Sequence, residues 1–315
     1  MSDKILYGGQ AVIEGVMMRG RRFVACAVRD PKGEIVSIIE PISPAIYNGA
    51  WAKIPFLRAG TILWDTLVLG TKMLLHSANI AVTDETKKDA PAEASRAADT
   101  PPALPTGVAL GTLAVSLTFG IGLFFVVPLG LVGLIDPYLN AQFSAVSASV
   151  VSNLLEGIIR LLIFLGYIGV ISLMPDIRRV FQYHGAEHKT IAADEAGAEL
   201  KPEIIQTYSK EHPRCGTGFL LTVVVVSIFV FALLGQPPML LRIASRILLI
   251  PVVAALSYEL IKFSSAHRSN PVLYWLVVKP SLWLQSLTTR EPDDRMIEVA
   301  VTALQRVKAE EAGQV

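Results

Sequence analysis

Residues 216–234, GTGFLLTVVVVSIFVFALL, contain no charged side chain and are long enough to cross a hydrocarbon core of about 30 Å as a helix. Three further segments, at about 105–135, 153–174 and 239–263, are similarly apolar. Hydrophobic residues make up 52% of the chain and charged residues only 17%, whereas a soluble globule has about a quarter charged residues. The sequence therefore predicts a mainly α-helical, polytopic transmembrane bundle of about four spans.

The distribution of charge predicts an orientation in the membrane. Residues 136–152 contain no lysine or arginine, whereas residues 175–217 contain six, and basic connections remain in the cytoplasm. Arg242 and Arg246, near the opposite surface, argue mildly the other way. We expect a multi-pass protein of the bacterial inner (cytoplasmic) membrane, with the 175–217 connection and both termini in the cytoplasm. Charges within the spans, such as Glu156 and Arg160, should pair or face the protein interior.

The remaining segments have patterns of their own. Residues 1–50 are predicted to form a cytoplasmic Gly-rich and β-hairpin element, with a hairpin at 22–41 around the turn Asp30-Pro31-Lys32-Gly33. Arg58, Asp65 and Lys72 share one helical face, which favours an interfacial amphipathic helix at 51–82 over a re-entrant or spanning one. The organisation predicted beyond these segments is a disordered linker at 83–105, a membrane domain at 106–290 with aromatic interfacial residues at 271–287, and an amphipathic helix at 291–315.

One pattern carries chemistry, His184-Gly185-Ala186-Glu187-His188. Histidines four residues apart lie on one helical face, so both imidazoles can reach one divalent ion, with zinc as the expected metal. Glu187 beside them is a candidate general base, and the spacing matches the inverted zinc-peptidase signature. The plain alternative is a polar helix leaving the membrane with both histidines in solvent.

The predicted topology brings other candidate ligands to the same membrane face. His212 and Cys215 precede the 216–234 segment, and Glu259 lies near the cytoplasmic end of the last one. With Glu259, the two motif histidines leave a metal position open, as a hydrolytic site needs. With His212 and Cys215 they close a tetrahedron, as in a structural site. Isolated His76 and His267 are assigned no role.

The N-terminal run at 7–20 has four glycines but neither the phosphate-loop nor the dinucleotide-binding spacing. Glu14 and Arg19 could line a site there, or the run could be a turn-rich strand pair packed on the membrane domain. Arg214, beside Cys215 at a helix start, is a further candidate because a nearby cation favours a thiolate. The two cysteines, Cys26 and Cys215, form no disulfide framework and suit a reducing compartment.

Three stretches carry a family resemblance: GGQAVIEGVMMRG at 8–20, FQYHGAEHK at 181–189 and HPRCGT at 212–217. They closely resemble the YqhQ-like family of bacterial membrane proteins, whose domain is the domain of unknown function 1385. The resemblance covers nearly the whole chain except 83–105 and the last residues. It implies a predicted metal-dependent enzyme and names neither substrate nor reaction.

The leading functional prediction is a zinc-dependent membrane hydrolase with its site at the cytoplasmic surface, acting on a lipid-linked molecule or a peptide near the bilayer. An oligomer is compatible with the sequence, whereas a net charge of +1 gives no reason to expect nucleic acid. The alternative is a transporter or assembly factor with a structural metal; broken spans or inverted repeats would favour transport. A third possibility is nucleophilic chemistry at Cys215, with His184 or His188 as base.

Overall fold

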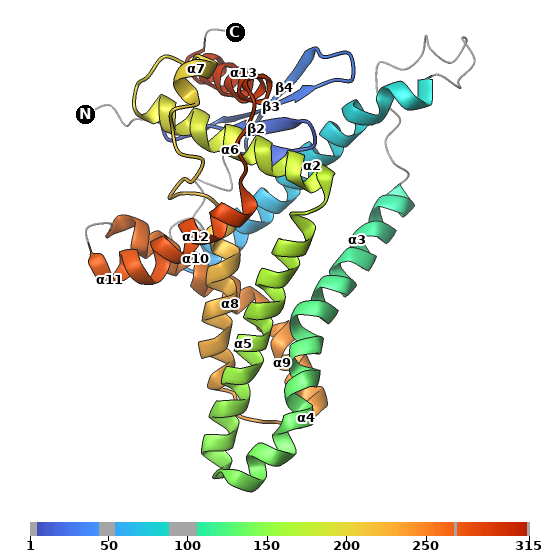
Figure 1. Cartoon of the computed structure of the whole chain (residues 1–315), viewed down its shortest axis with the longest axis vertical. Coiled ribbons are helices and arrows are strands. Elements are labelled where there is room, and N and C mark those ends of the chain that lie inside the picture. Colours follow the sequence, from blue (N-terminus) through green and yellow to red (C-terminus); the bar gives the residue numbers. More distant parts are fainter. Residues whose placement is uncertain (1–4, 44–53, 88–105, 268–269, 314–315) are drawn as a thin grey trace.

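The computed structural model describes residues 5–43, 54–87, 106–267 and 270–313. The protein is mostly helical and has a small antiparallel sheet near its N-terminus, so the predicted mainly α-helical class and the N-terminal β element are confirmed. The sheet and both ends of the chain lie at one end of an elongated molecule, and a bundle of helices extends away from them (Figure 1).

The sheet is a meander in the order β1-β2-β3-β4. Its strands are β1 Gly8–Val12, β2 Gly15–Arg19, β3 Phe23–Arg29 and β4 Ile35–Pro41. The Gly-rich run therefore forms the strand pair that one of its two interpretations predicted, and β3 and β4 form the predicted hairpin. Glu14, in the turn between β1 and β2, has a φ of 52°, a left-handed conformation that is uncommon for a residue with a side chain.

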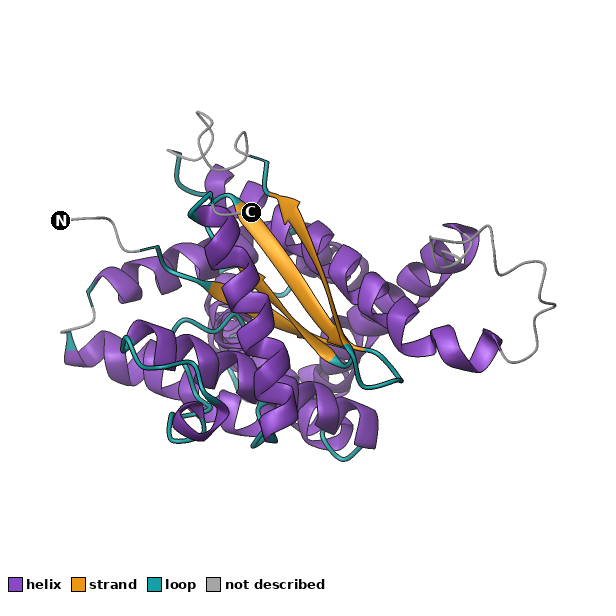
Figure 2. Ribbon diagram, turned by 90° about the horizontal axis from the view of Figure 1, so that it is seen from above, coloured by secondary structure: helices purple, strands orange, loops and turns teal. Residues whose placement is uncertain are grey.

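Helices cover both faces of this sheet (Figure 2). Side chains alternate between the faces of a strand, so Val16 and Met18 of β2 pack with helices α6 (Pro175–Glu195) and α13 (Asp294–Glu311). Met17 points the other way, towards Met73 of helix α2 (Leu57–Lys87). The sheet is thus the middle layer of a three-layer cap above the bundle.

Helix α13 agrees with the amphipathic pattern read from the sequence. Asp293 caps it by accepting a hydrogen bond of 2.9 Å from the backbone N–H of Met296. Of its predicted apolar stripe, Ile297, Leu304 and Val307 are fully buried and Val301 is partly buried. The helix therefore places its apolar face on the sheet.

Helix α2 is longer than predicted, because residues 83–87 are helical and do not belong to a linker. The rest of the predicted linker, 88–105, lies outside the described residues, as do residues 44–53. The three charges predicted to share a face do so, and each is paired with another element: Arg58 with Glu259, Asp65 with Arg19, and Lys72 with Glu40.

Two helices of the bundle are long and apolar enough to cross a membrane. Helix α3 (Thr106–Ile121), a π-helical turn (Gly122–Val126) and α4 (Val127–Gln142) form one continuous run, and α5 (Ala145–Ile171) returns beside it. The predicted uncharged connection at 136–152 is wrong, because α4 continues to Gln142 and Ser144 already caps α5. Asp136 therefore lies within α4, where its carboxylate pairs with Arg242.

The other two predicted spans are shorter or broken. Helix α8 (Thr217–Ala232) has 16 residues. At 1.5 Å per residue, its length of about 24 Å falls short of the hydrocarbon core. Helices α9 (Met239–Leu248) and α10 (Ile250–Ala266) meet at 45°, next to Pro251, which has no backbone N–H to continue the helical hydrogen bonds. The described chain therefore has two candidate spans, or three if the bent pair is one span, and four spans are not confirmed.

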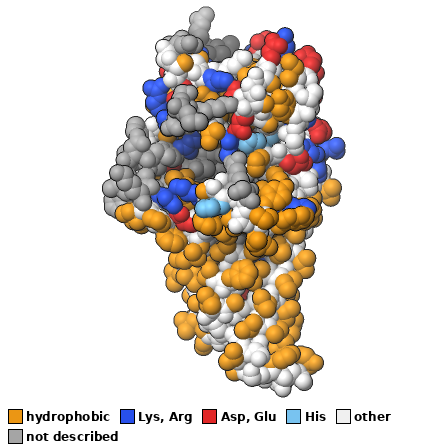
Figure 3. Space-filling view, turned by 90° about the vertical axis from the view of Figure 1, so that its left-hand side faces the viewer, with side chains coloured by type: hydrophobic (Ala, Val, Ile, Leu, Met, Phe, Trp, Pro, Cys, Tyr) orange, Lys and Arg blue, Asp and Glu red, His pale blue; other side chains and the backbone are white. Residues whose placement is uncertain are grey.

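The remaining elements connect the bundle to the cap. They are α7 (Pro202–Ile205), α11 (Pro271–Leu273), a second π-helical turn (Tyr274–Val278) and α12 (Lys279–Thr288). The view in Figure 3 shows a lower part covered mostly by hydrophobic side chains, whereas Lys, Arg, Asp and Glu gather in the upper part. This division agrees with association with a membrane through the lower part.

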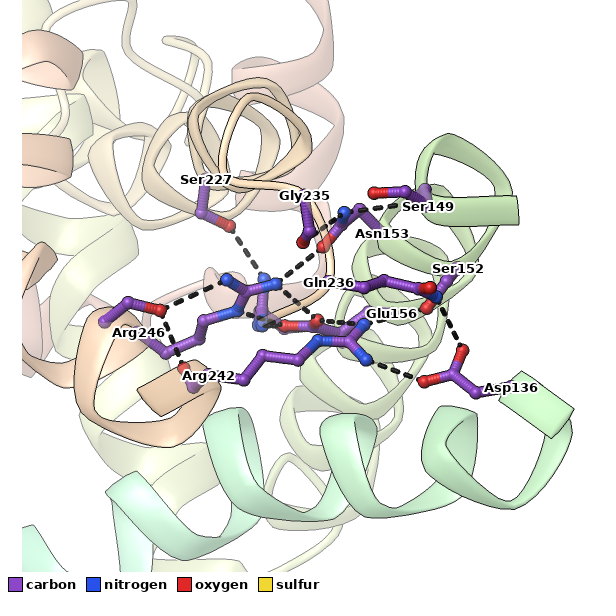
Figure 4. Close-up of polar contacts among 12 residues, drawn as sticks. Asp136, Ser149, Ser152, Asn153, Glu156, Ser227, Gly235, Gln236, Arg242 and Arg246 are labelled. Carbon is purple, nitrogen blue, oxygen red and sulfur yellow. Dashed lines mark hydrogen bonds and ion pairs between the residues drawn. The ribbon is translucent and has the colours of Figure 1, made fainter. Parts of the chain in front are cut away.

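Charges inside the bundle form one network around Glu156, whose side chain is 1% exposed (Figure 4). Its carboxylate oxygens lie 2.5 Å from Arg160, 2.9 Å from Arg246 and 3.3 Å from Arg242. Arg242 also reaches Asp136 at 2.7 Å, so α4, α5 and α9 are joined. The prediction that Glu156 and Arg160 pair within the protein is confirmed.

Replacing Glu156 with Gln should destabilise the protein severely, because three buried guanidinium groups would lose their shared carboxylate. Removing one partner of a buried ion pair costs about 3–5 kcal/mol. Thermal unfolding in detergent measures the loss, and Glu199→Gln, in an exposed pair with Lys201, is the matched control. Equal stability of the two variants would contradict a structural role for the network.

The arrangement also predicts that the turn at Phe143 and the loop at Gly197 lie on opposite sides of the membrane, because the turn between α4 and α5 is at the end of the bundle remote from the cap. A reporter that is active only outside the cytoplasm should be active after residue 143 and silent after residue 197. The reverse pattern would invert the orientation, and activity at neither position would show that the hairpin does not cross.

Candidate metal centre

The histidine motif lies in the buried second half of α6. His184, Glu187 and His188 are all buried, and the two imidazole rings are 4.3 Å apart between centroids. Their spacing of one helical turn places them on the same face, as predicted. The alternative of a helix with both histidines in solvent is therefore wrong.

Backbone carbonyls orient both imidazoles. Nδ1 of His184 lies 2.8 Å from the carbonyl oxygen of Thr288, at the end of α12, and Nδ1 of His188 lies 2.6 Å from that of Lys210. A carbonyl oxygen only accepts, so in each ring Nδ1 carries the proton and donates it. The lone pair of each ring is consequently on Nε2, and this is the usual arrangement of metal-ligating histidines.

Cys215 lies beside the two histidines and forms a group of three potential ligands with them. Its Sγ lies 3.1 Å from Nε2 of His184, and the three potential ligand atoms of His184, His188 and Cys215 lie within 4.8 Å of one another. Nε2 of His188 is buried and has no hydrogen-bond partner among the described residues. Buried polar atoms in proteins are normally satisfied, so a cation bound between the three residues fits this group.

The protonation state of His188 suits ligation. Burial, together with the neighbouring His184, lowers the pKa of His188 to about 3, although its hydrogen bond to Lys210 acts in the opposite direction. The ring is therefore neutral, the form that binds metals. Burial raises the pKa of Cys215, against the hydrogen bonds from Thr217 that lower it. A raised pKa does not favour Cys215 as a free thiolate nucleophile.

Glu187 connects the histidine motif to the Gly-rich strand β1. It accepts a backbone hydrogen bond from Gly9, and burial raises the pKa of Glu187 to about 8. A Cβ at position 9 would lie 3.0 Å from the Glu187 carboxyl carbon and 2.5 Å from the carbonyl oxygen of Met17. Only glycine fits this contact, so the two motifs meet at one place.

A cavity of about 390 Å³ opens beside this group. Glu187, His188 and Cys215 contribute to its wall, β1 closes another side, and α2 contributes Thr66 and Leu69. The volume lies within the range of small-molecule sites. The candidate metal group therefore adjoins a space that can admit a ligand.

Gly185, inside the motif, allows a close backbone contact. The carbonyl oxygen of Arg290 approaches it so closely that a Cβ would clash, and the N–H of Arg290 donates a 2.9 Å hydrogen bond to the carbonyl of Phe181. The segment between α12 and α13 is thereby fixed to α6. The same segment begins directly after Thr288, whose carbonyl orients His184.

His212 lies next to the group rather than within it. Its ring is 5.8 Å from that of His188, and its Nε2 faces Glu195 at 3.5 Å. Gln285 holds its backbone with hydrogen bonds of 2.8 and 3.0 Å. The closed set of His184, His188, His212 and Cys215 is therefore not assembled, although His212 lines the same cavity.

Glu259 is placed elsewhere, so the ligand set that included it is not supported. Its carboxylate binds the Arg58 guanidinium through both oxygens, at the start of α2. The sequence placed it correctly near the end of the last apolar segment but gave no sign of this partner.

The three further candidates all form ion pairs. Glu14 binds Arg179 at 2.5 Å, away from the ligand group, and Arg19 binds Asp65 at 3.1 Å. Arg214 pairs with Glu195. Arg19 and Arg214 line the cavity, whereas Glu14 does not.

Sequence reasoning missed the parts of the site that have no chemical signature. The carbonyls of Thr288 and Lys210 belong to the backbone, which every residue has, and Glu195 belongs to no motif. Gly9 could have been found, since it lies in a run whose glycines already suggested a close backbone approach.

The fold and the site define a membrane-associated helical protein with a small sheet-containing cap and a buried His/His/Cys group that can hold a metal ion. The chain belongs to the family described as protein of unknown function DUF1385, whose model matches residues 54–310. It is 35% identical over 307 residues to the uncharacterized protein YqhQ of Bacillus subtilis (strain 168), covering 97% of this chain and 93% of that protein. No solved structure matches the chain.

We expect purified protein to bind one zinc ion per chain, and His184→Ala, His188→Ala and Cys215→Ser each to reduce the bound zinc to near zero, since each removes one of three ligands. Glu259→Gln should retain it. Elemental analysis after dialysis against a weak chelator measures the stoichiometry. Loss of zinc in Glu259→Gln and retention in Cys215→Ser would reverse the assignment.

Proposed function

We propose that this protein is a zinc-dependent hydrolase acting at the cytoplasmic surface of the bacterial inner membrane. The observation that carries the proposal is the orphaned, buried Nε2 of His188, directed with Nε2 of His184 and Sγ of Cys215 towards one point in the wall of a cavity. Three protein ligands leave a fourth position free for water or substrate, as in catalytic sites, whereas structural sites use four.

The donor set favours zinc over harder cations. Imidazole nitrogens and a thiolate suit zinc, and magnesium and calcium prefer oxygen ligands. The donors come from α6 and from the start of α8, and carbonyls from two further segments fix the imidazoles. This rigid support is what a preorganised centre needs.

When bound, zinc would supply a Lewis acid that polarises a carbonyl or phosphoryl oxygen of the substrate. Glu187 is the candidate proton acceptor: it lines the same cavity, the Gly9 N–H orients its carboxyl group, and a cation bound nearby would lower its raised pKa and so favour the carboxylate that takes the proton. The sheet above and the bundle below would limit the entry of bulk water. Hydrolysis is therefore the reaction class that these residues support best.

A non-enzymatic transporter, with the metal as a structural element, is the second candidate. It is favoured by one observation, the bent pair α9 and α10 beside the buried charges of Glu156, Arg242 and Arg246. Broken helices next to intramembrane charges are common in transporters. In that case Glu187 would have no chemical role.

Glu187→Gln separates the two functions. The amide keeps the size of the side chain but cannot accept a proton, so zinc content and thermal stability should stay near those of the wild type. Activity should fall by about 10²–10⁴-fold, the usual contribution of a general base. Complementation of a strain that lacks the gene provides the readout without a known substrate.

Two further variants serve as controls for this experiment. His188→Ala should lose both zinc and complementation, because a ligand is removed, and Glu199→Gln, at an exposed position, should lose neither. Full complementation by Glu187→Gln would exclude the hydrolase and leave the structural-metal interpretation.

A further inference from the structure

Helix α2 exposes large apolar side chains, although charged residues on it are paired with other parts of the protein. Arg58, Asp65 and Lys72 each form an ion pair with another element, whereas Trp64 is 69% and Leu67 63% exposed. The helix lies between the sheet and the bundle (Figure 1). Such a helix is stable at the boundary between head groups and acyl chains.

A shallow groove of about 300 Å³ follows this outward face. Leu63, Leu67 and Leu74 line it, at positions that recur on one side of the helix. Its walls include no charged side chain. The groove therefore suits a hydrocarbon chain and offers little to a polar ligand.

The groove meets the cavity of the candidate metal centre. Thr66 and Gln10 line both, so the two hollows adjoin at these residues. At this junction the side-chain oxygen of Gln10 packs against the backbone of Gly70. A Cβ at position 70 would clash with that oxygen. The groove on α2 and the cavity beside Glu187 and His188 are thus neighbouring parts of one path, with Gln10 and Thr66 at their junction.

The two ends of this path differ in chemistry. The inner end holds the His/His/Cys group and the guanidinium groups of Arg19 and Arg214. The middle is apolar, with Leu6, Met17 and Leu69, and the outer end is lined mainly by leucines together with uncharged polar residues such as Thr71. A ligand that matches the whole path has one polar end and one long apolar chain.

We propose that the substrate is a membrane lipid, whose polar head group enters the cavity beside His188 and Cys215 while one hydrocarbon chain lies in the α2 groove. The proposal rests on the hydrolase function only for the reaction at the head group. A bound divalent cation would offer its open coordination position to an oxygen of the head group, so the inner end favours a phosphate or ester head group. A peptide is less suited, because α2, which forms most of the groove wall, has its backbone groups bonded within the helix.

The test is photolabelling in vesicles of phosphatidylethanolamine and phosphatidylglycerol. The probe is a phosphatidylglycerol analogue with a diazirine on its head group, and mass spectrometry locates the adducts. Lipid in the bulk bilayer cannot reach Met17, which is 4% exposed, so labels at Met17 and Leu69 report entry into the cavity.

Thr66→Trp should close the junction and reduce labelling at Met17 and Leu69 by about tenfold or more, the effect expected when a bulky side chain fills a binding path. The matched control is Val68→Trp, which places the same side chain about 200° around the helix, outside both hollows. It should label like the wild type. A second pair, Leu67→Glu and Val68→Glu, places a charge inside and outside the groove at exposed positions, and serves if Thr66→Trp fails to fold.

Zinc content, measured on the same samples, keeps the two proposals apart. Cavity labels that depend on the groove support the lipid site, even if zinc is absent and the hydrolase proposal fails. Equal cavity labelling in the groove variants and their controls, or no cavity labelling in zinc-loaded wild-type protein, overturns the lipid proposal and leaves the hydrolase standing. Labelling of the cavity by a diazirine-bearing apolar peptide, with none by the lipid, would assign the path to peptides.

Discussion

The arrangement of the bundle depends on the carboxylate of Glu156. In a low-dielectric interior an isolated charge is very costly, so Arg160, Arg242 and Arg246 can be buried only because they converge on it and on neighbouring polar groups. The π-helical turn at Gly122–Val126 contributes to the same network, because the Phe124 carbonyl accepts a 2.8 Å hydrogen bond from Nε of Arg160. The irregularity in this helix thus has a function in pairing a charge.

The cost of burying polar groups without partners also applies at the candidate metal centre, but there the protein leaves a polar group without a partner. Around Glu156 the donors and acceptors are supplied almost entirely by the protein itself. Around His188 and Cys215 the protein supplies lone pairs without a matching cation, and carbonyls fix the imidazoles so that these lone pairs converge. The charges of the first group are paired within the protein, whereas the second group could hold a cation.

The sequence was most informative where a pattern is local. The i,i+4 spacing of His184 and His188, the stripe of α13 and the hairpin at 22–41 depend on neighbouring residues, and the structure agrees with each. Helix ends were predicted less well. Asp136 looked like the end of a span because its partner, Arg242, is 106 residues away in the sequence. Glu259 was a candidate ligand because its partner, Arg58, is also far away in the sequence and could not be predicted from neighbouring residues.

Long-range contacts also decide which candidate ligands come together in the structure, and neither of the two predicted sets is brought together as a whole. His212 and Cys215 are three residues apart, yet Gln285 and Glu195 hold the histidine to one side while the cysteine reaches His184. Spacing alone cannot distinguish these outcomes. Composition gave the membrane association, but the lengths of individual helices required the structure.

The backbone contact at Gly185 links the segment between α12 and α13 to helix α6. The segment that leaves α12 and enters α13 is the covalent connection between the bundle and the last helix of the cap, and the Arg290 backbone holds it against α6. Thr288, at the start of this segment, supplies the carbonyl that sets the proton position of His184. The orientation of the His184 imidazole therefore depends on how the cap is seated on the bundle, so that the candidate metal centre is connected to both layers.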